Sequence, residues 1–215
     1  MNNRLQEMAL EEYISEHSSP EPEILQDLTR EAYRTLIHPR MVSGHIQGRF
    51  LKFLVKMIAP KRVLELGTYI GYSALCIAEG LSEDALLTTI EVNDELEQRI
   101  LDLFDKAGVS KKIELLIGDA VKILPTLPLE EFQLVYLDAN KALYPEYYRI
   151  LSDRMKSDSY IIADNTLWGG KLLDPKSHDP QTRGIREFNE LVAHDNRMEK
   201  LLLPLRDGLT LIRIE

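Results

Sequence analysis

The sequence has very little cysteine, with Cys76 as the single example among 215 residues. One cysteine cannot form an intrachain disulfide or build a structural zinc site on its own, which excludes disulfide scaffolds and zinc fingers. Long hydrophobic runs are also missing: no segment approaches about 18 consecutive apolar residues, and residues 1–17 are charged. We therefore expect a soluble, cytoplasmic protein without a secretion signal or a membrane contact.

Positive charge is scarce as well, because 26 Lys and Arg residues stand against 35 Asp and Glu residues, for a net charge of −9. This balance disfavours a general nucleic-acid coat and a protein held to anionic lipid. The segment 30–62 is the exception, since Glu31 is its one acidic residue. Its basic residues are Arg30, Arg34, Arg40, Arg49, Lys52, Lys56, Lys61 and Arg62. They match a phosphate-bearing substrate or, alternatively, form the solvated faces of two amphipathic helices.

The amino-terminal part of the chain carries helical patterns and no strand signal. Helices are expected over residues 5–15, 23–37 and 46–58. Pro22 lies at the start of the second helix, and Pro60 follows the third. We therefore expect residues 1–60 to form a helical cap that is continuous with the rest of a single domain.

From residue 62 onward, short runs rich in Val, Ile and Leu alternate with helical segments, which is typical of parallel βαβ units. The runs cover residues 63–67, 86–92, 113–118, 132–138 and 159–164. Asn93 is a helix cap after the second run, and a further helix is expected over 181–194. The last two runs, 201–205 and 209–214, flank a turn and predict an antiparallel pair. The pattern therefore predicts an α/β fold.

Ligands of an open α/β sheet bind beyond the carboxyl ends of its strands. The first run is followed by Gly67 and Gly71, which flank a tight turn and allow backbone to approach a ligand; the alternative is a turn used only for helix packing. Tyr69 occupies the place of the middle glycine of the dinucleotide fingerprint, so an NAD-dependent oxidoreductase is disfavoured.

Two acidic residues follow the next runs. Glu91 ends the second run at close to the roughly 20-residue spacing of a ribose-binding acid. Its alternative is a solvated carboxylate at a helix start. Asp119 and Ala120 follow the third run, where they can lie beside an adenine ring, although Asp119 can equally cap the next helix. Glu91 and the turn at Asp119 and Ala120 are therefore both compatible with a bound nucleoside.

Oxygen ligands follow the fourth and fifth runs. Asp138 ends one run, and Asp164 with Asn165 ends the other, so we expect the three side chains to lie close together. An all-oxygen set suits Mg²⁺ or Ca²⁺ and not zinc; the alternative is that each Asp caps the helix after its strand. Lys141 can reach the same place and act as a base, unless it is an ordinary surface lysine.

Taken together, these segments resemble the cation-dependent O-methyltransferases, a family that includes caffeoyl-CoA and catechol O-methyltransferases and bacterial relatives. The matching segments, from about Met41 to the end, are VLELGTYIGYS, TTIEV, GDA, YLDANK, IIADNTLWGG and DGLTLIRI. The resemblance implies a Rossmann-like class I methyltransferase fold, with a seven-stranded, mostly parallel sheet and an antiparallel last strand. Residues 61–215 would bind S-adenosylmethionine, with Mg²⁺ or another divalent cation such as Ca²⁺ or Mn²⁺ beside it.

The resemblance also implies roles for individual residues. The residues implied to bind the cofactor are Ser43, Glu65, Gly67, Thr68, Ser73, Glu91, Ala120 and Asp138. The implied metal ligands are Asp138, Asp164 and Asn165, and Lys141 is the implied general base, with Asp138 beside it in the catalytic group. Ile70 stands where the family usually has Thr, which leaves the glycines of the turn intact.

The acceptor implied by the resemblance is a catechol-type or CoA-linked phenol, with a modified wobble uridine of tRNA as the alternative. Trp168, in a glycine-flanked loop, is a candidate wall for a planar acceptor. Tyr144, Tyr147 and Tyr148 could also contact it, but their helical spacing favours core packing. Relatives are commonly homodimers, so we expect one here through the amino-terminal helices. A non-catalytic protein on the same fold is disfavoured by the intact Asp138, Lys141, Asp164 and Asn165 set.

Overall fold

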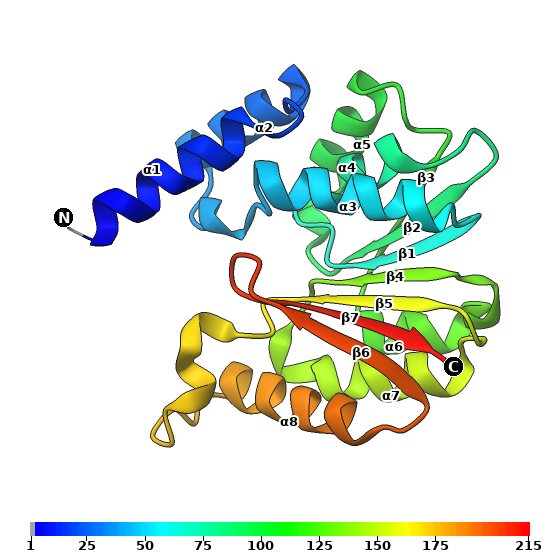
Figure 1. Ribbon diagram of the computed structural model, residues 1–215. Helices are drawn as coiled ribbons and strands as arrows, with labels where there is room; N and C mark the ends of the chain where they lie inside the picture. The colour runs from blue at the N-terminus through cyan, green and yellow to red at the C-terminus, as the bar shows by residue number, and fades with distance from the viewer. Residues whose placement is uncertain (1–2) are drawn as a thin grey trace.

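The runs rich in Val, Ile and Leu form one seven-stranded sheet in the computed structural model, which describes residues 3–215 (Figure 1). The strand order is β3-β2-β1-β4-β5-β7-β6. The strands are β1 (Arg62–Leu66), β2 (Leu86–Glu91), β3 (Ile113–Ile117), β4 (Leu134–Leu137), β5 (Tyr160–Asp164), β6 (Met198–Leu203) and β7 (Leu209–Ile214). All neighbours from β3 to β5 pair in parallel, whereas β7 is antiparallel to both β5 and β6. The expected fold class is confirmed.

Helices cover both faces of this sheet (Figure 1). The α-helices are α1 (Asn3–Glu16), α2 (Glu23–Thr35), α3 (His45–Ile58), α4 (Tyr72–Gly80), α5 (Glu97–Lys106), α6 (Ala120–Ile123), α7 (Tyr144–Arg154) and α8 (Pro180–His194). Short 3₁₀ segments are η1 (Pro39–Met41), η2 (Asp94–Leu96), η3 (Leu124–Thr126), η4 (Leu129–Glu131), η5 (Lys141–Leu143) and η6 (Trp168–Leu173). No helix within residues 3–215 is both long and apolar enough to cross a membrane.

The core has two halves, one on each face of the sheet. Leu51 of α3, Ile77 of α4 and Phe104 of α5 belong to the first half. The second half contains Phe188 of α8 and the tyrosines of α7, namely Tyr144, Tyr147 and Tyr148. Core packing is therefore the correct interpretation of these tyrosines, although Tyr147 also reaches the cleft described below. The α1 helix extends away from this body (Figure 1).

The order of the strands creates the position for a ligand. β1 lies between β2 and β4, so the chain builds outward from β1 in both directions. The crossover connections diverge at this point, and a crevice forms beyond the carboxyl ends of β1 and β4. The residues expected to be functional follow these and the adjoining strands.

Several element boundaries differ from those expected from the sequence. α2 ends at Thr35, because Leu36 is extended and Pro39 follows shortly after. β6 begins at Met198, which pairs with Ile214, and it ends before Pro204, which has no N–H for a ladder hydrogen bond. The expected cap is present: the Asn93 side chain accepts a hydrogen bond from the backbone N–H of Glu95.

Candidate active site

A cleft of about 1130 Å³ lies at the carboxyl ends of the central strands. It brings together all of the site residues expected from the sequence except Glu65. These lining residues are Ser43, Gly67, Thr68, Ser73, Glu91, Ala120, Asp138, Lys141, Asp164, Asn165 and Trp168. Residues far apart in the sequence therefore share one cavity, as the positions of the strand ends predicted.

Glu65 lies behind the wall of the cleft. It is fully buried, and its Oε2 accepts a hydrogen bond of 2.5 Å from Thr89 Oγ1. The Thr89 hydroxyl is in turn 2.6 Å from the hydroxyl of Thr68, which lines the cleft. Burial raises the pKa of the Glu65 carboxyl to about 7, and the hydroxyls of Ser73 and Thr89 oppose this rise. Glu65 thus supports the wall from beneath.

The turn after β1 places two strand ends in close contact. Gly67 has a φ of 96°, and a Cβ at this position would lie 2.1 Å from the carbonyl oxygen of Asp138. Only glycine allows the ends of β1 and β4 to approach in this way. Gly71 has a packing role, since its Cβ would meet Leu103 and Phe104 at 3.0 Å. Packing is therefore part of this motif's role, but Gly67 also shapes the cleft.

Glu91 is held in place by backbone groups. Its carboxylate accepts hydrogen bonds from the N–H of Tyr69, at 2.6 Å, and of Asn93, at 2.9 Å. Because only 6% of Glu91 is exposed, its interpretation as a solvated carboxylate is wrong. Asp119 is the expected helix cap, because its side chain accepts a hydrogen bond from the N–H of Val121, and it also lines the cleft.

The carboxylates of Asp138 and Asp164 face the same part of the cleft. The pKa of Asp138 is raised to about 7, chiefly by burial; Lys141 opposes the rise, and the Asp164 charge adds to it. The neighbouring Asn165 has a φ of 57° and supplies an amide. Neither Asp caps the helix after its strand. The N-cap position of η5, after Asp138, is Asn140, and the N-cap position of η6, after Asp164, is Leu167. The helix-cap alternative is therefore wrong.

This donor set fits a hard divalent cation. The charge of Asp164 raises the pKa of Asp138, and a cation held by both carboxylates would remove this repulsion. Within residues 3–215, no group of three His, Cys, Asp or Glu side chains could hold a metal ion, so the Asn165 amide is needed to complete the oxygen set. An oxygen set without sulfur or imidazole matches Mg²⁺, Ca²⁺ or Mn²⁺.

Lys141 is 8% exposed and contacts the Oδ1 of Asp138 through its Nζ. It also donates to the carbonyl of Ala139 at 3.1 Å and lies 5.1 Å from the centre of the Tyr144 ring. Its interpretation as a surface lysine is wrong. A lysine in this position has the reach to exchange a proton with a molecule bound at the two carboxylates.

The chain matches the O-methyltransferase family over residues 15–214. It belongs to that family. It is 36% identical to a caffeoyl-CoA O-methyltransferase of Petroselinum crispum, over 97% of this chain and 92% of the relative. The family and the enzyme class expected from the motifs, S-adenosylmethionine-dependent O-methyltransferases, are thereby confirmed.

Solved structures of other methyltransferases share the fold. An O-methyltransferase from Bacillus cereus in complex with SAH superimposes with a TM-score of 0.88 at 26% identity, covering 96% of this chain and 97% of the other. A methyltransferase from Podospora anserina, also bound to SAH, gives 0.90 at 28% identity, covering 100% and 97%.

Trp168 of this O-methyltransferase is fixed on one side of the cleft. Its indole Nε1 donates to the Thr182 hydroxyl at 3.1 Å, and the Lys171 ammonium lies 5.9 Å from the ring centre. Besides glycines, the residues with positive φ that line the cleft are Tyr69, Asn165, Trp168 and Arg206. Strained backbone of this kind concentrates at functional sites.

Sequence reasoning missed three polar residues of the site. Arg206, in the turn between β6 and β7, lines the cleft and hydrogen-bonds to the carbonyl of Ser43. Gln47 and Tyr136 are buried and hydrogen-bond to Asp164. A signal for Gln47 was available, because it precedes Leu51 and Val55 at four-residue intervals and so falls on the apolar face of α3.

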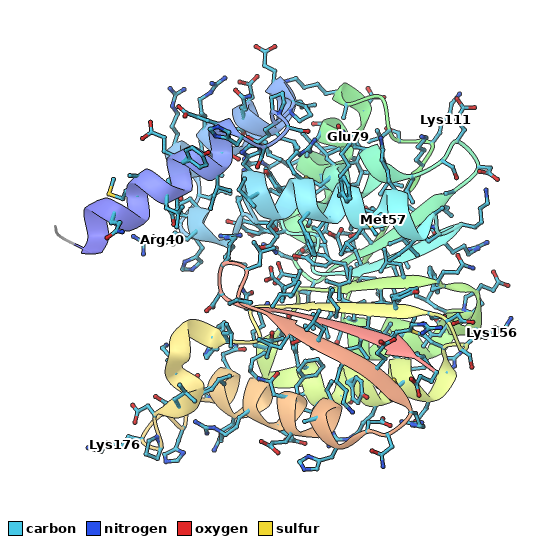
Figure 2. The ribbon with its side chains drawn as sticks, viewed as in Figure 1. Arg40, Met57, Glu79, Lys111, Lys156 and Lys176 are labelled. Carbon is cyan, nitrogen blue, oxygen red and sulfur yellow. The ribbon has the colours of Figure 1, made fainter. Side chains whose placement is uncertain are left out.

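Most of the basic residues in segment 30–62 are paired with acids. Arg49 and Lys52 both contact Glu79. The other pairs are Arg30 with Asp27, Lys61 with Asp84, and Arg62 with Glu131. Arg40, by contrast, lines the cleft and lies at η1 (Figure 2). The segment is therefore less of a free cationic platform than its composition suggests.

Proposed function

We propose that this O-methyltransferase transfers the methyl group of S-adenosylmethionine to one hydroxyl of a vicinal pair on a phenolic acceptor, with a divalent cation bound at Asp138, Asp164 and Asn165. The observation that carries the proposal is the pair formed by the buried Asp164 and the largely buried Asp138 beside Lys141 in the cleft. Relatives that act on caffeoyl-CoA support a phenolic, CoA-linked acceptor.

The opposite part of the cleft would hold the cofactor. The fixed Glu91 carboxylate has acceptor capacity left for ribose hydroxyls. Thr68 and Ser73 would face the methionine part with Ser43 across the cleft, and Ala120 would lie at the adenine. Gly67 would leave room for the cofactor, and Asp138 would lie between the cofactor and the cation. Glu65 would act on the cofactor through the Thr89 and Thr68 hydroxyls.

The reaction follows from this placement. Asp138, Asp164 and Asn165 would hold a divalent cation, which would supply Lewis-acid chemistry that lowers the pKa of an acceptor hydroxyl. The neutral amine form of Lys141 would receive the hydroxyl proton at Nζ, and Asp138 would hold the resulting ammonium in place. The acceptor oxygen then forms its bond to the methyl carbon in line with the carbon–sulfur bond, which breaks and leaves a neutral sulfur. The positive sulfonium of the cofactor and the negative acceptor oxygen neutralise each other in this step. A cleft that excludes water therefore favours it.

Acceptors that differ by one hydroxyl test the proposal. We expect label from S-adenosylmethionine to appear on caffeoyl-CoA or caffeate in the presence of Mg²⁺. We expect none on p-coumaroyl-CoA, which has a single hydroxyl and cannot chelate. Equal labelling of both CoA esters would refute the requirement for a vicinal pair. Label on bulk tRNA alone would refute the phenolic acceptor; the ion pairs of segment 30–62 give that alternative no support.

We also propose that the protein is a homodimer. Large apolar side chains are exposed on α1 and α3, among them Tyr13 and Ile14 on α1 and Phe53 on α3. Met57 of α3 is exposed as well (Figure 2). Such surfaces mark interfaces between copies of a chain. Light scattering during gel filtration should give twice the 24.7 kDa chain mass, and a monomer at micromolar concentration would refute the proposal.

A further inference from the structure

Gln47 is a buried polar residue on the face of α3 that packs against the sheet. Only 1% of it is exposed, and it shares its face with Leu51 and Val55. A polar side chain in this position is costly unless its donors and acceptor are all satisfied. Each of its polar atoms does have a partner, and these partners connect three separate parts of the chain.

The orientation of the Gln47 amide is fixed from both ends. Its Nε2 donates to Asp164 Oδ2 at 2.6 Å and to the Tyr136 hydroxyl at 2.8 Å. Its Oε1 accepts from Arg206 Nη1 at 3.2 Å. A carboxylate only accepts and a guanidinium only donates, so the amide nitrogen must face Asp164 and the amide oxygen must face Arg206. A flipped amide would leave both contacts repulsive.

The same contacts divide the Asp164 carboxylate into two unlike oxygens. Oδ2 accepts from both Gln47 and Tyr136, the latter at 3.0 Å. Oδ1 accepts one hydrogen bond, of 2.7 Å, from the N–H of Asn165. Because each carboxylate oxygen has two lone pairs, Oδ2 is fully used and the remaining acceptor capacity lies on Oδ1.

Arg206 connects this group to the segment before α3. Besides Gln47, its guanidinium donates to the carbonyls of Val42, at 3.3 Å, and Ser43. Arg206 itself has a φ of 50°, at the turn between β6 and β7. It therefore holds Gln47 and the neighbouring backbone at once.

We propose that Gln47 is a positioning residue for Asp164, and that Arg206 fixes the amide orientation this requires. The inference rests on the proposed function, in which Asp164 is a cation ligand. Gln47 touches neither reactant and acts through the Asp164 carboxylate, which it turns so that Oδ1 is available. Partners of this kind, one contact away from a ligand, commonly change metal affinity about 10–100-fold when they are removed.

Direct binding of Mn²⁺, measured by calorimetry and electron paramagnetic resonance without acceptor, tests the inference. Gln47→Met keeps the length of the side chain but removes its donors, and it should weaken Mn²⁺ binding about 10–100-fold. Lys56→Met, at an exposed position of the same helix, should bind Mn²⁺ as the wild type does. The affinity for S-adenosylmethionine in EDTA should be unchanged in both variants.

A second pair of variants covers the case in which Gln47→Met does not fold. Arg206→Met should weaken Mn²⁺ binding because the amide of Gln47 is then free to flip, and Arg206→Lys, which retains a donor, should restore most of it. If the variants lost affinity for both Mn²⁺ and S-adenosylmethionine, in proportion to their loss of thermal stability, Gln47 and Arg206 would have a merely structural role. This result would overturn the inference.

The two possible failures are distinguishable. Wild-type Mn²⁺ affinity in Gln47→Met, together with lost affinity in Asp164→Asn, would overturn the positioning role and leave the proposed function intact. Absence of Mn²⁺ binding in the wild type would overturn the cation site itself, and the positioning role with it.

Discussion

The ammonium of Lys141 lies against the carboxylate of Asp138, three positions earlier in the chain. Asn140, between them, caps η5 by accepting from the N–H of Ala142, and this turn folds Lys141 back over the end of β4. The two side chains are only 10% and 17% exposed, so they form a nearly dry pair at the wall of the cleft. Lys141 is thereby kept beside the carboxylates.

Replacing Lys141 by Met should lower kcat about 10²- to 10⁴-fold, because the proton acceptor is lost while the shape is nearly preserved. The dissociation constant of S-adenosylmethionine should change little. Lys156→Met is the matched control, since Lys156 is exposed at the far end of the sheet from Arg40 (Figure 2). An unchanged kcat in Lys141→Met would remove Lys141 from the reaction.

Gly67→Ala should destabilise the fold much more than Gly108→Ala. Both glycines have positive φ, which costs alanine about 1–2 kcal/mol. A Cβ on Gly67 would in addition collide with the Asp138 carbonyl, whereas nothing lies within 4 Å of one on Gly108. Overpacking adds roughly 1–3 kcal/mol at the first position. Urea denaturation of the two variants measures the difference, and equal losses would mean that the strand ends separate easily.

The buried Glu65 carboxyl should make stability depend on pH. Its pKa is about 7 in the folded protein and near the ordinary value of 4.5 in the unfolded chain. The folded state therefore holds a proton that the unfolded state releases. Its contribution to stability is complete below pH 4.5, falls as the pH rises towards 7, and is lost above that value.

Glu65→Gln isolates this effect, because the amide is neutral at every pH and keeps an acceptor for Thr89. The free energy of unfolding of the wild type should fall relative to the variant between pH 5 and pH 8, by an amount on the order of 1–3 kcal/mol. Parallel stability curves would show that Glu65 ionises in the folded protein as it does in the unfolded chain.

Trp168→Ala should raise the KM of the acceptor about tenfold, which is the order expected for loss of an aromatic contact. The affinity for S-adenosylmethionine should not change. Trp168→Phe keeps a ring but loses the hydrogen bond to Thr182, so a smaller rise is expected. If both variants had wild-type KM values, Trp168 would not contact the acceptor.

The sequence predicted the positions that depend on local pattern. Asp138, Glu91 and Asp164 follow apolar runs, and parallel strands bring such ends to one edge of a sheet. The depth of Glu65 could not be predicted in this way, because its neighbours on β2, Thr89 above all, decide that it lies beneath the wall. Arg206 could not be predicted either, since its partner Ser43 lies 163 positions away and meets it only through the folded turn.

Cation dependence of methyl transfer tests the central claim most directly. Label transfer from S-adenosylmethionine to caffeoyl-CoA is measured with Mg²⁺, with EDTA, and with EDTA followed by excess Mg²⁺, and cofactor binding is measured in the same buffers. We predict that EDTA abolishes transfer, that Mg²⁺ restores it, and that S-adenosylmethionine binds throughout. Full transfer in EDTA would contradict the account, because Asp138, Asp164 and Asn165 would then act without a cation.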